Sequence, residues 1–209
     1  MFPGLMSRTG FGQSMPRKKI ETVIEPIYFP RRYRVVGGDI SLKRPGFAIL
    51  TVEKQEDGSL TFLDVRTVCV DNKTDKKKAK GELLDDVLRA ITLFFPDQEK
   101  DGIETFYVRE KYISSHGSTY ESSIYEAIGI SDWYLWRIGK TWHELYPVTI
   151  KKLVAGTGRA EKQDVANALT AYLGQREYAT DDESDAAAVA IAWLIQQGQL
   201  SPVTREAEA

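Results

Sequence analysis

Three apolar stretches of strand length follow one another between residues 33 and 70, and tight turns separate them. The first turn contains Pro45-Gly46 and the second contains Asp57-Gly58. Short apolar runs joined by such turns are typical of antiparallel hairpins. We therefore expect the folded domain to open with a three-stranded antiparallel meander, with strands over 33–39, 47–53 and 60–70.

Helical and strand patterns alternate after the meander. Apolar residues recur at helical spacing over 77–95, and Pro96 ends that pattern. This order predicts an α/β fold with a five-stranded mixed sheet, in which the antiparallel meander is followed by parallel strands and helices flank the sheet. The remaining predicted elements are a strand over 105–109, a helix over 118–142, a strand over 147–154, a helix that Gly174 ends, and a helix over 184–197.

The length of 209 residues suits one domain that buries its own core. We place this domain over 33–198. Residues 1–32 carry four prolines and several basic residues, so we expect a flexible basic arm there. Residues 199–209 are expected to be a flexible tail.

Charge is nearly balanced, with 28 basic and 30 acidic residues, so the bulk composition gives no preference for nucleic acid. The distribution is uneven, because the arm is basic and residues 73–80 include five lysines. Such local patches can follow a phosphate backbone even in a neutral chain. Two solvated surface runs are the alternative interpretation.

Cys69 is the only cysteine, which excludes an internal disulfide and a cysteine metal site and fits a reducing compartment. No apolar run reaches the length of a membrane span, and the N-terminus has no apolar signal core. We therefore expect a cytoplasmic protein that does not enter a membrane. An organelle transit peptide stays open, because the first twenty residues lack acidic side chains.

Four carboxylates occupy positions that suit metal binding. Asp39 and Glu110 end predicted strands, and Asp182 and Asp185 lie three residues apart, on one face of the last helix. Carboxyl ends of strands carry the reactive groups in many such sheets. Carboxylate oxygens suit hard divalent cations, and two such ions can support in-line displacement at phosphorus. Taken singly, each acid is also an ordinary turn, strand-end or helix-capping residue.

Several stretches resemble the RuvC family of Holliday-junction resolvases, which belongs to the RNase H-like superfamily. The segment "GTGRAEKQDV" (156–165) is similar to one that family members carry after the fifth strand. The resemblance spans about residues 33–197. It also rests on "RVVGGDISLKRPGFAIL" (34–50), "FYVREKYI" (106–113) and "DDESDAAAVAIAWL" (181–194).

The resemblance implies an RNase H-like fold and a crossover junction endonuclease of DNA recombination and repair. It implies that Asp39, Glu110, Asp182 and Asp185 are catalytic residues that bind Mg²⁺ or Mn²⁺. It also implies a homodimer that nicks a four-way DNA junction symmetrically. The dimer face would include the helix over 120–140, which carries Trp133, Tyr134 and Trp136.

The glycine-rich stretch is a candidate for substrate binding. Glycines let a backbone approach a phosphate closely, and the N–H groups of a helix start favour an anion. We expect this loop to hold DNA beside the acidic site. A plain strand-to-helix loop capped by Glu161 is the alternative. The residues concerned are Gly156, Thr157, Gly158, Arg159 and Lys162.

The chain departs from the family pattern at two places. Ile40 and Ser41 follow Asp39, where the family usually has proline and glycine. The family's aromatic probe of the junction centre aligns with Ile113, although Tyr112 is adjacent, and we keep Tyr112 as the candidate substrate contact. The basic arm and the lysine run at 71–80 go beyond what compact cellular members carry, which suggests a phage or mobile-element version.

Histidines are weaker candidates for phosphate contacts or general bases, because a solvated or hydrogen-bonded surface histidine is the common case. His116 lies in the loop after Glu110, so we expect it at the substrate and rank it above His143.

Three other functions remain open on the sequence. A broader debranching nuclease for flaps and forks would keep the same fold and acids. A non-catalytic junction-binding protein would use the acids only to stabilise helix starts. An actin-like phosphotransferase would need an Asp-x-Gly phosphate loop, whereas this sequence has Asp39-Ile40-Ser41.

Overall fold

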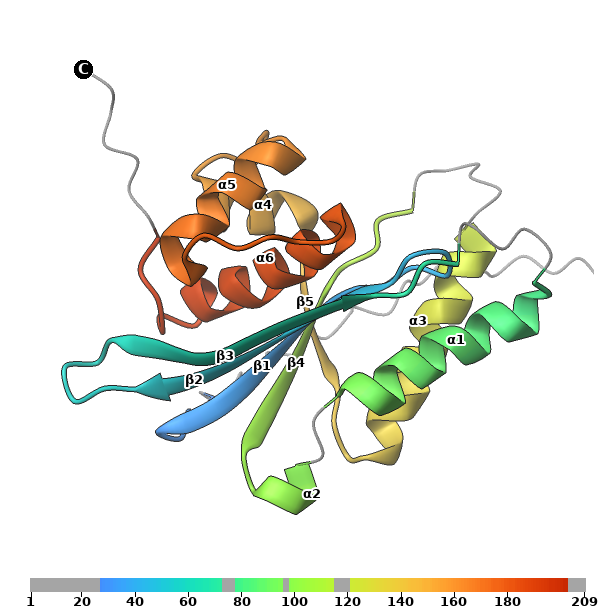
Figure 1. Ribbon diagram of the computed structural model, residues 1–209, viewed down its shortest axis with the longest axis horizontal. Coiled ribbons are helices and arrows are strands. Elements are labelled where there is room, and N and C mark those ends of the chain that lie inside the picture. The colour runs from blue at the N-terminus through green and yellow to red at the C-terminus, as the bar shows by residue number, and fades with distance from the viewer. Residues whose placement is uncertain (1–26, 73–77, 96–97, 115–120, 203–209) are drawn as a thin grey trace, which may run out of the picture.

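The computed structural model describes residues 27–72, 78–95, 98–114 and 121–202, and its five strands form one mixed sheet (Figure 1). The strand order is β3-β2-β1-β4-β5. The first three strands pair antiparallel, and β4 pairs parallel to both β1 and β5. The predicted α/β fold with an opening meander is therefore confirmed. The strands are β1 (Arg32–Asp39), β2 (Gly46–Lys54), β3 (Leu60–Cys69), β4 (Glu104–Glu110) and β5 (Trp142–Leu145).

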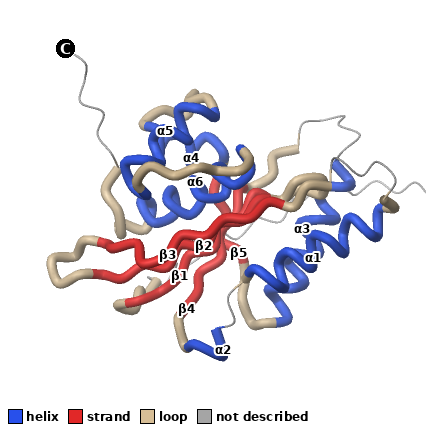
Figure 2. The backbone as a smooth tube through the Cα atoms, in the orientation of Figure 1, coloured by secondary structure: helices blue, strands red, loops and turns tan. Residues whose placement is uncertain are grey.

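Helices cover the sheet from two sides (Figures 1 and 2). The group α4, α5 and α6 packs on one face, while α1 and α3 lie together on the other. No helix within the described ranges is both long and apolar enough to cross a bilayer. The helices are α1 (Lys80–Phe94), α2 (Gln98–Asp101), α3 (Glu121–Arg137), α4 (Pro147–Ala155), α5 (Lys162–Leu173) and α6 (Asp181–Gln196).

The predicted strand over 147–154 was wrong, because this segment is α4. Pro147 occupies the first turn, where its missing N–H costs nothing, and Ile150 and Val154 lie four residues apart on the buried face. The fifth strand is instead Trp142–Leu145; the predicted helix had extended to Trp142, and residues 143–146 had been assigned to no element. A strand of four residues is too short for its periodicity to be distinguished from a helix end.

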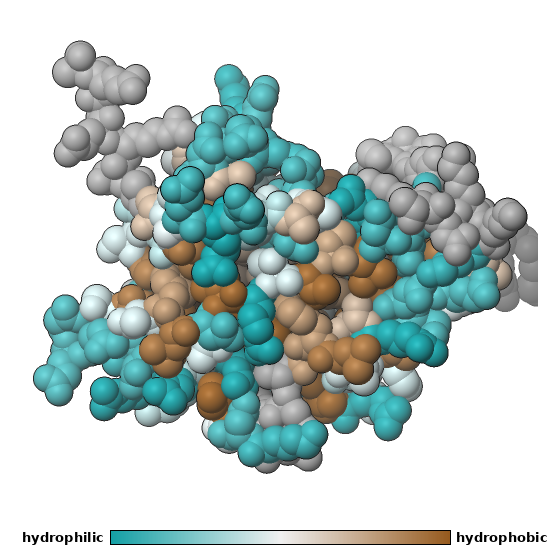
Figure 3. Space-filling view, in the orientation of Figure 1, coloured by the Kyte–Doolittle hydropathy of each residue, from teal (hydrophilic) through white to brown (hydrophobic). Residues whose placement is uncertain are grey.

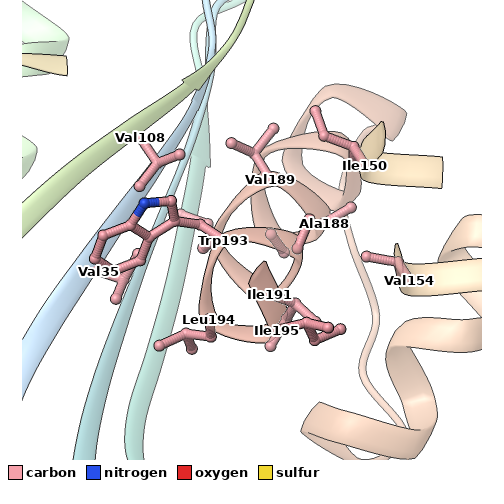
Figure 4. Packing of buried hydrophobic residues seen from close by; sticks show 14 of the residues in the cluster. Val35, Val108, Ile150, Val154, Ala188, Val189, Ile191, Trp193, Leu194 and Ile195 are labelled. Carbon is pink, nitrogen blue, oxygen red and sulfur yellow. The ribbon is translucent and has the colours of Figure 1, made fainter. Parts of the chain in front are cut away.

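Helix α6 is the centre of the larger core. Its residues from 186 to 195 are all buried, and Trp193 lies on the sheet beside Val35 and Val108 (Figure 4). Alanines let the helix axis approach the strands closely. A Cβ on Gly37 would lie 2.1 Å from the carbonyl oxygen of Ala186, so only glycine permits this contact. This close approach sets the distance between the N-terminal part of α6 and the end of β1.

A second core lies between the sheet and the pair α1 and α3. Phe95 is its centre, because its ring meets Phe47 and Tyr107 of the sheet and Tyr134 of α3. Burial of such side chains stabilises by about 1.5–3 kcal/mol each. The sheet is thus covered on both faces, and its strand ends meet between the two helix groups.

Parts of three predictions fall outside the described residues. They concern most of the basic arm (1–26), most of the lysine run (73–77) and the end of the tail (203–209). Residues just before β1 do pack on the larger core, since the ring of Phe29 lies 5.2 Å from that of Tyr33 and 5.5 Å from that of Trp193. The arm and the tail remain predictions.

Candidate active site

Strand register brings two of the predicted carboxylates together. In the parallel pair of β1 and β4, Gly38 lies opposite Arg109, so Asp39 and Glu110 both follow at the same edge of the sheet. Helix α6 crosses above this edge and adds Asp185. These three carboxylates line one cavity of about 310 Å³, together with Lys151 of α4 and Lys162 of α5.

Two carboxylates of the cavity, Asp39 and Glu110, lie in surroundings that disfavour their negative charge. Burial raises the pKa of Asp39 to about 7, and the negative charges of Glu110, Asp185 and Asp182 act on it in the same direction. Burial and Asp185 also raise the pKa of Glu110, against the opposing effect of Lys151 and Lys162. Among the described residues, neither the Asp39 nor the Glu110 carboxylate has a hydrogen bond or an ion pair. Such a pair of carboxylates is stabilised by a cation.

Lys162 places a cation in direct contact with one acid of the cavity. Its Nζ donates a hydrogen bond of 2.7 Å to Oδ2 of Asp185. This bond raises the pKa of Lys162, so the side chain stays protonated. The sequence pattern predicted Lys162 on the DNA side of the site, whereas here it contacts a predicted metal ligand directly.

Asp182 points to a different neighbourhood from Asp185, although one helical turn separates them. Its Oδ2 lies 3.2 Å from Nε of Arg44, in the loop between β1 and β2, and 4.0 Å from Sγ of Cys69. Asp182 still raises the pKa of Asp39, so its charge acts on the site. Glu183, between them, is buried and accepts a hydrogen bond from Thr67, which is a structural contact.

The donor set has the chemistry of a hard divalent cation site, because it consists of carboxylates with two members that lack a partner among the described residues. As the side chains stand, the described residues include no group of three acidic, histidine or cysteine side chains arranged to hold an ion. The ion pairs to Lys162 and Arg44 account for this arrangement, because they turn Asp185 and Asp182 toward cations of the protein. The residues fit a metal if these two ion pairs open.

The glycine-rich segment connects two helices and not a strand to a helix. Gly156 ends α4 in the left-handed conformation, at φ 78°, and Glu161 caps α5. Gly158 packs against Val148, because a Cβ there would lie 2.7 Å from a methyl carbon of that residue. Thr157 and Arg159 are exposed in the loop between these helices. The expected role of this loop in binding phosphate stays a prediction.

The remaining candidate residues, two near the end of β4 and two histidines, lie in different surroundings. The ring of Tyr112 packs edge-on against Tyr125 of α3 at 5.5 Å, while Ile113 is 56% exposed. His116 lies outside the described residues. His143 on β5 packs against Trp193 at 5.2 Å, and burial lowers its pKa. It is not among the residues that line the carboxylate cavity.

Sequence reasoning missed two basic residues of the site. Lys151 lines the cavity because residues 147–155 form a helix, and the predicted strand gave no reason to single it out. Arg44, which precedes the Pro45-Gly46 turn, was not singled out, yet it pairs with Asp182. A helical reading of 147–155, based on Pro147 and the spacing of Ile150 and Val154, would have pointed to Lys151.

Known proteins resemble the chain over most of its length. The family model for crossover junction endodeoxyribonuclease RuvC matches residues 35–193. The crossover junction endodeoxyribonuclease RuvC of Rhizobium johnstonii is 27% identical over 165 residues, which cover 79% of this chain and 91% of that protein. The one of Synechococcus sp. (strain CC9605) is 30% identical over 163 residues, which cover 77% of this chain and 98% of that protein.

Solved structures show the same fold. The Thermus thermophilus RuvC structure superposes with a TM-score of 0.61 at 19% identity, covering 81% of this chain and 99% of that one. The structure of T. thermophilus RuvC in complex with a Holliday junction substrate gives a TM-score of 0.57 at 20% identity, covering 82% and 99%. With its matching family model and its carboxylate-lined strand ends, the chain belongs to the crossover junction endodeoxyribonuclease RuvC family of Holliday-junction nucleases.

Proposed function

We propose that the protein resolves four-way DNA junctions by hydrolysing phosphodiester bonds at the cavity between β1, β4 and α6. The observation that carries the proposal is the convergence of Asp39, Glu110 and Asp185 on one cavity, with Asp182 one turn away on α6. Membership of the family and the fold shared with a junction-bound neighbour support it. Such an enzyme would act where bacterial or phage DNA is, in the cytoplasm.

Asp39, Glu110, Asp185 and Asp182 would hold Mg²⁺ or Mn²⁺. When bound, such ions would supply charge that lowers the pKa of a water and stabilises a leaving oxygen. The protein contributes position, because Asp39 and Glu110 are fixed by strand pairing and α6 is fixed by its close packing on Gly37. One P–O bond to the attacking oxygen forms as the P–O bond to the leaving oxygen breaks.

Cationic side chains around the cavity would hold the substrate. Lys151 lines it, Lys162 pairs with Asp185, and Arg159 is exposed at the adjoining loop. A metal ion that takes Asp185 would free the Lys162 ammonium group for a phosphate oxygen. Recognition of a branched substrate would rest on phosphate contacts and on the shape of the junction, since phosphate contacts carry no base sequence.

A homodimer is the second part of the proposal. Helix α3 exposes Trp136 by 74%, Tyr125 by 53% and Trp133 by 45%. Exposed aromatic groups of this size on one helix are enriched at interfaces between proteins. Two copies joined through α3 would present two equivalent sites, which paired nicks in a junction with twofold symmetry require.

Cleavage of a labelled four-way junction tests the activity. The wild-type protein should place paired, symmetric nicks in the junction with Mg²⁺ or Mn²⁺ and leave linear duplex intact. Asp39→Asn and Asp182→Asn should each lower the rate by about a thousandfold or more, because a metal ligand is lost. Asp181→Asn is the matched control, since Asp181 is exposed on the same turn of α6, and it should cut within about twofold of wild type.

Other outcomes would point to other functions. Equal cutting of flaps, forks and junctions would identify a broader debranching nuclease. Tight junction binding without cutting in either metal would identify a junction-binding protein and would contradict the proposed role of the carboxylates.

A further inference from the structure

A second cavity, of about 750 Å³, adjoins the carboxylate site and is lined by four basic side chains. Lys43 and Arg44 come from the loop between β1 and β2, and Lys78 and Lys80 come from the start of α1. Asp182 is the acidic residue in the lining, with apolar and serine side chains completing the wall. The cavity therefore joins a predicted metal ligand to a basic surface that the catalytic proposal does not use.

The loop that carries Arg44 is held in place by the protein. The backbone N–H of Arg44 donates to Oγ of Ser41 at 3.0 Å. The buried side chain of Asn72 donates to the carbonyl of Leu42 at 3.2 Å, and its backbone N–H donates to the carbonyl of Lys43 at 2.9 Å. These bonds hold the backbone of the loop, and the Arg44 side chain that it carries reaches Asp182 of α6.

The contact between Arg44 and Asp182 is an ion pair with poor hydrogen-bond geometry. Nε of Arg44 lies 3.2 Å from Oδ2 of Asp182, but it is buried without a well-aligned hydrogen bond. A guanidinium group binds best when an anion meets two of its N–H groups in its plane. A phosphate entering the cavity can offer that geometry, whereas Asp182 on the rigid helix does not.

One lysine of the cavity, Lys80, can turn toward such a phosphate at low cost. Lys78 pairs with Asp86 and Lys80 pairs with Glu126, each at 2.7 Å. The side chains of the second pair are 49% and 39% exposed. Ion pairs this exposed contribute little to stability, so their exchange for a DNA phosphate is nearly neutral.

We propose that the Arg44 cavity is a phosphate subsite for the DNA strand beside the scissile bond, and that occupation of it releases Asp182 for metal binding. The proposal rests on the proposed function. Asp182 and Asp185 reach the two cavities from positions one turn apart on α6, about 5 Å along the helix. A DNA strand bound at the carboxylate cavity would therefore also pass the Arg44 cavity. Arg44 is thus a positioning residue that couples DNA binding to assembly of the metal site.

The first test measures metal binding without DNA. Arg44→Gln should bind Mn²⁺ at least about threefold more tightly than wild type, because Asp182 loses its cationic partner; the free Mn²⁺ signal in electron paramagnetic resonance gives the affinity. Lys43→Gln removes a charge from the same cavity but leaves the ion pair to Asp182, and it should bind Mn²⁺ within about twofold of wild type. Equal Mn²⁺ affinity in wild type and Arg44→Gln would overturn the proposal.

The second test measures junction binding by fluorescence anisotropy in a chelator, so that no metal contributes. Arg44→Gln should bind a four-way junction about tenfold more weakly. Arg89→Gln, which removes an exposed arginine from the far part of α1, should bind within about twofold. Arg44→Lys keeps the charge but loses the two-point contact, so it should bind more weakly than wild type and more tightly than Arg44→Gln; this recovery separates loss of the subsite from misfolding. Unchanged binding in Arg44→Gln would overturn the subsite.

Inorganic phosphate distinguishes the source of the phosphate group. If millimolar phosphate raises the Mn²⁺ affinity of wild type while Arg44→Gln binds the junction normally, the cavity is a site for free phosphate and the DNA assignment is overturned. Failure of the wild type to cut any branched DNA would contradict the proposed function. The Mn²⁺ and chelator measurements would still judge the role of Arg44.

Discussion

The two faces of the sheet are packed in opposite ways. On one face, α6 is buried along most of its length, and it lies so close to the strands that a Cβ added to Gly37 or Gly46 would come within 2.1 Å of one of its backbone oxygens. On the other face, α1 and α3 bury one side each and leave large apolar groups in solvent, among them Leu93 at 85% exposed. Figure 3 shows hydrophobic side chains gathered at the centre of one view, between the helix groups, and hydrophilic ones toward its margins.

The difference in packing suits the two faces to different functions. A carboxylate site needs groups held within a fraction of an ångström, and close packing of a helix on strands supplies that rigidity. An interface between copies needs accessible apolar surface, which a loosely covered face supplies. The comparison agrees with the proposal that the chemistry takes place at the α6 face and that two copies assemble through the α3 face.

The largest expected change in the free energy of unfolding is for a substitution on the closely packed face. Gly37→Ala should lower the free energy of unfolding by about 3 kcal/mol, because the new Cβ collides with the backbone of α6 and not with a movable side chain. Denaturant titration gives the value. Gly129→Ala on α3 is the matched control, because a Cβ there meets nothing within 4 Å. It should stabilise by about 0.5–1 kcal/mol. Similar costs at both glycines would erase the difference between the faces.

A smaller effect on stability is expected for the buried carboxylate of Asp39, on the α6 face of the sheet. The pKa of Asp39 is raised from 3.8 to about 7, so the folded protein prefers the protonated form. Stability from this group is fully present below pH 3.8 and is lost as the pH rises toward 7. In metal-free protein, Asp39→Asn should therefore gain about 1–3 kcal/mol over wild type between pH 5 and pH 8.

Thermal or denaturant unfolding in a chelator at the two pH values measures this gain. Asp181→Asn, which changes an exposed acid, should give a pH profile parallel to that of wild type. If the stability of Asp39→Asn also changed with pH in parallel with that of wild type, folding would not raise the pKa of Asp39.

The smallest expected effect on folding is on the open face. Trp136→Gln should change the free energy of unfolding of the monomer by less than about 0.5 kcal/mol, because the side chain is 74% exposed. It should nevertheless shift the dimer toward monomer, which sedimentation velocity measures. Leu63→Gln on β3 removes an exposed apolar group from another part of the surface and should leave the assembly unchanged. A dimer that persists in Trp136→Gln would place the interface elsewhere.

The sequence by itself determined the strand meander, the mixed sheet and the four acids at strand ends and on the last helix. Hydrophobic periodicity and turn residues act locally, so they can be read along the chain. The same local reading failed at 142–155, where a strand of four residues and a proline-started helix of nine residues are too short for their periodicity to identify them.

Only the tertiary structure decided which partner each acid has. Asp182 and Asp185 lie on one helical face in the sequence pattern, yet one pairs with Arg44 and the other with Lys162. These contacts depend on strand register and on how closely α6 approaches the sheet, which no local pattern contains. The physical reason is that ion pairs between distant segments form only after packing has fixed the backbone. The sequence could therefore point to the acids as candidates, but it could not predict which cations they would contact.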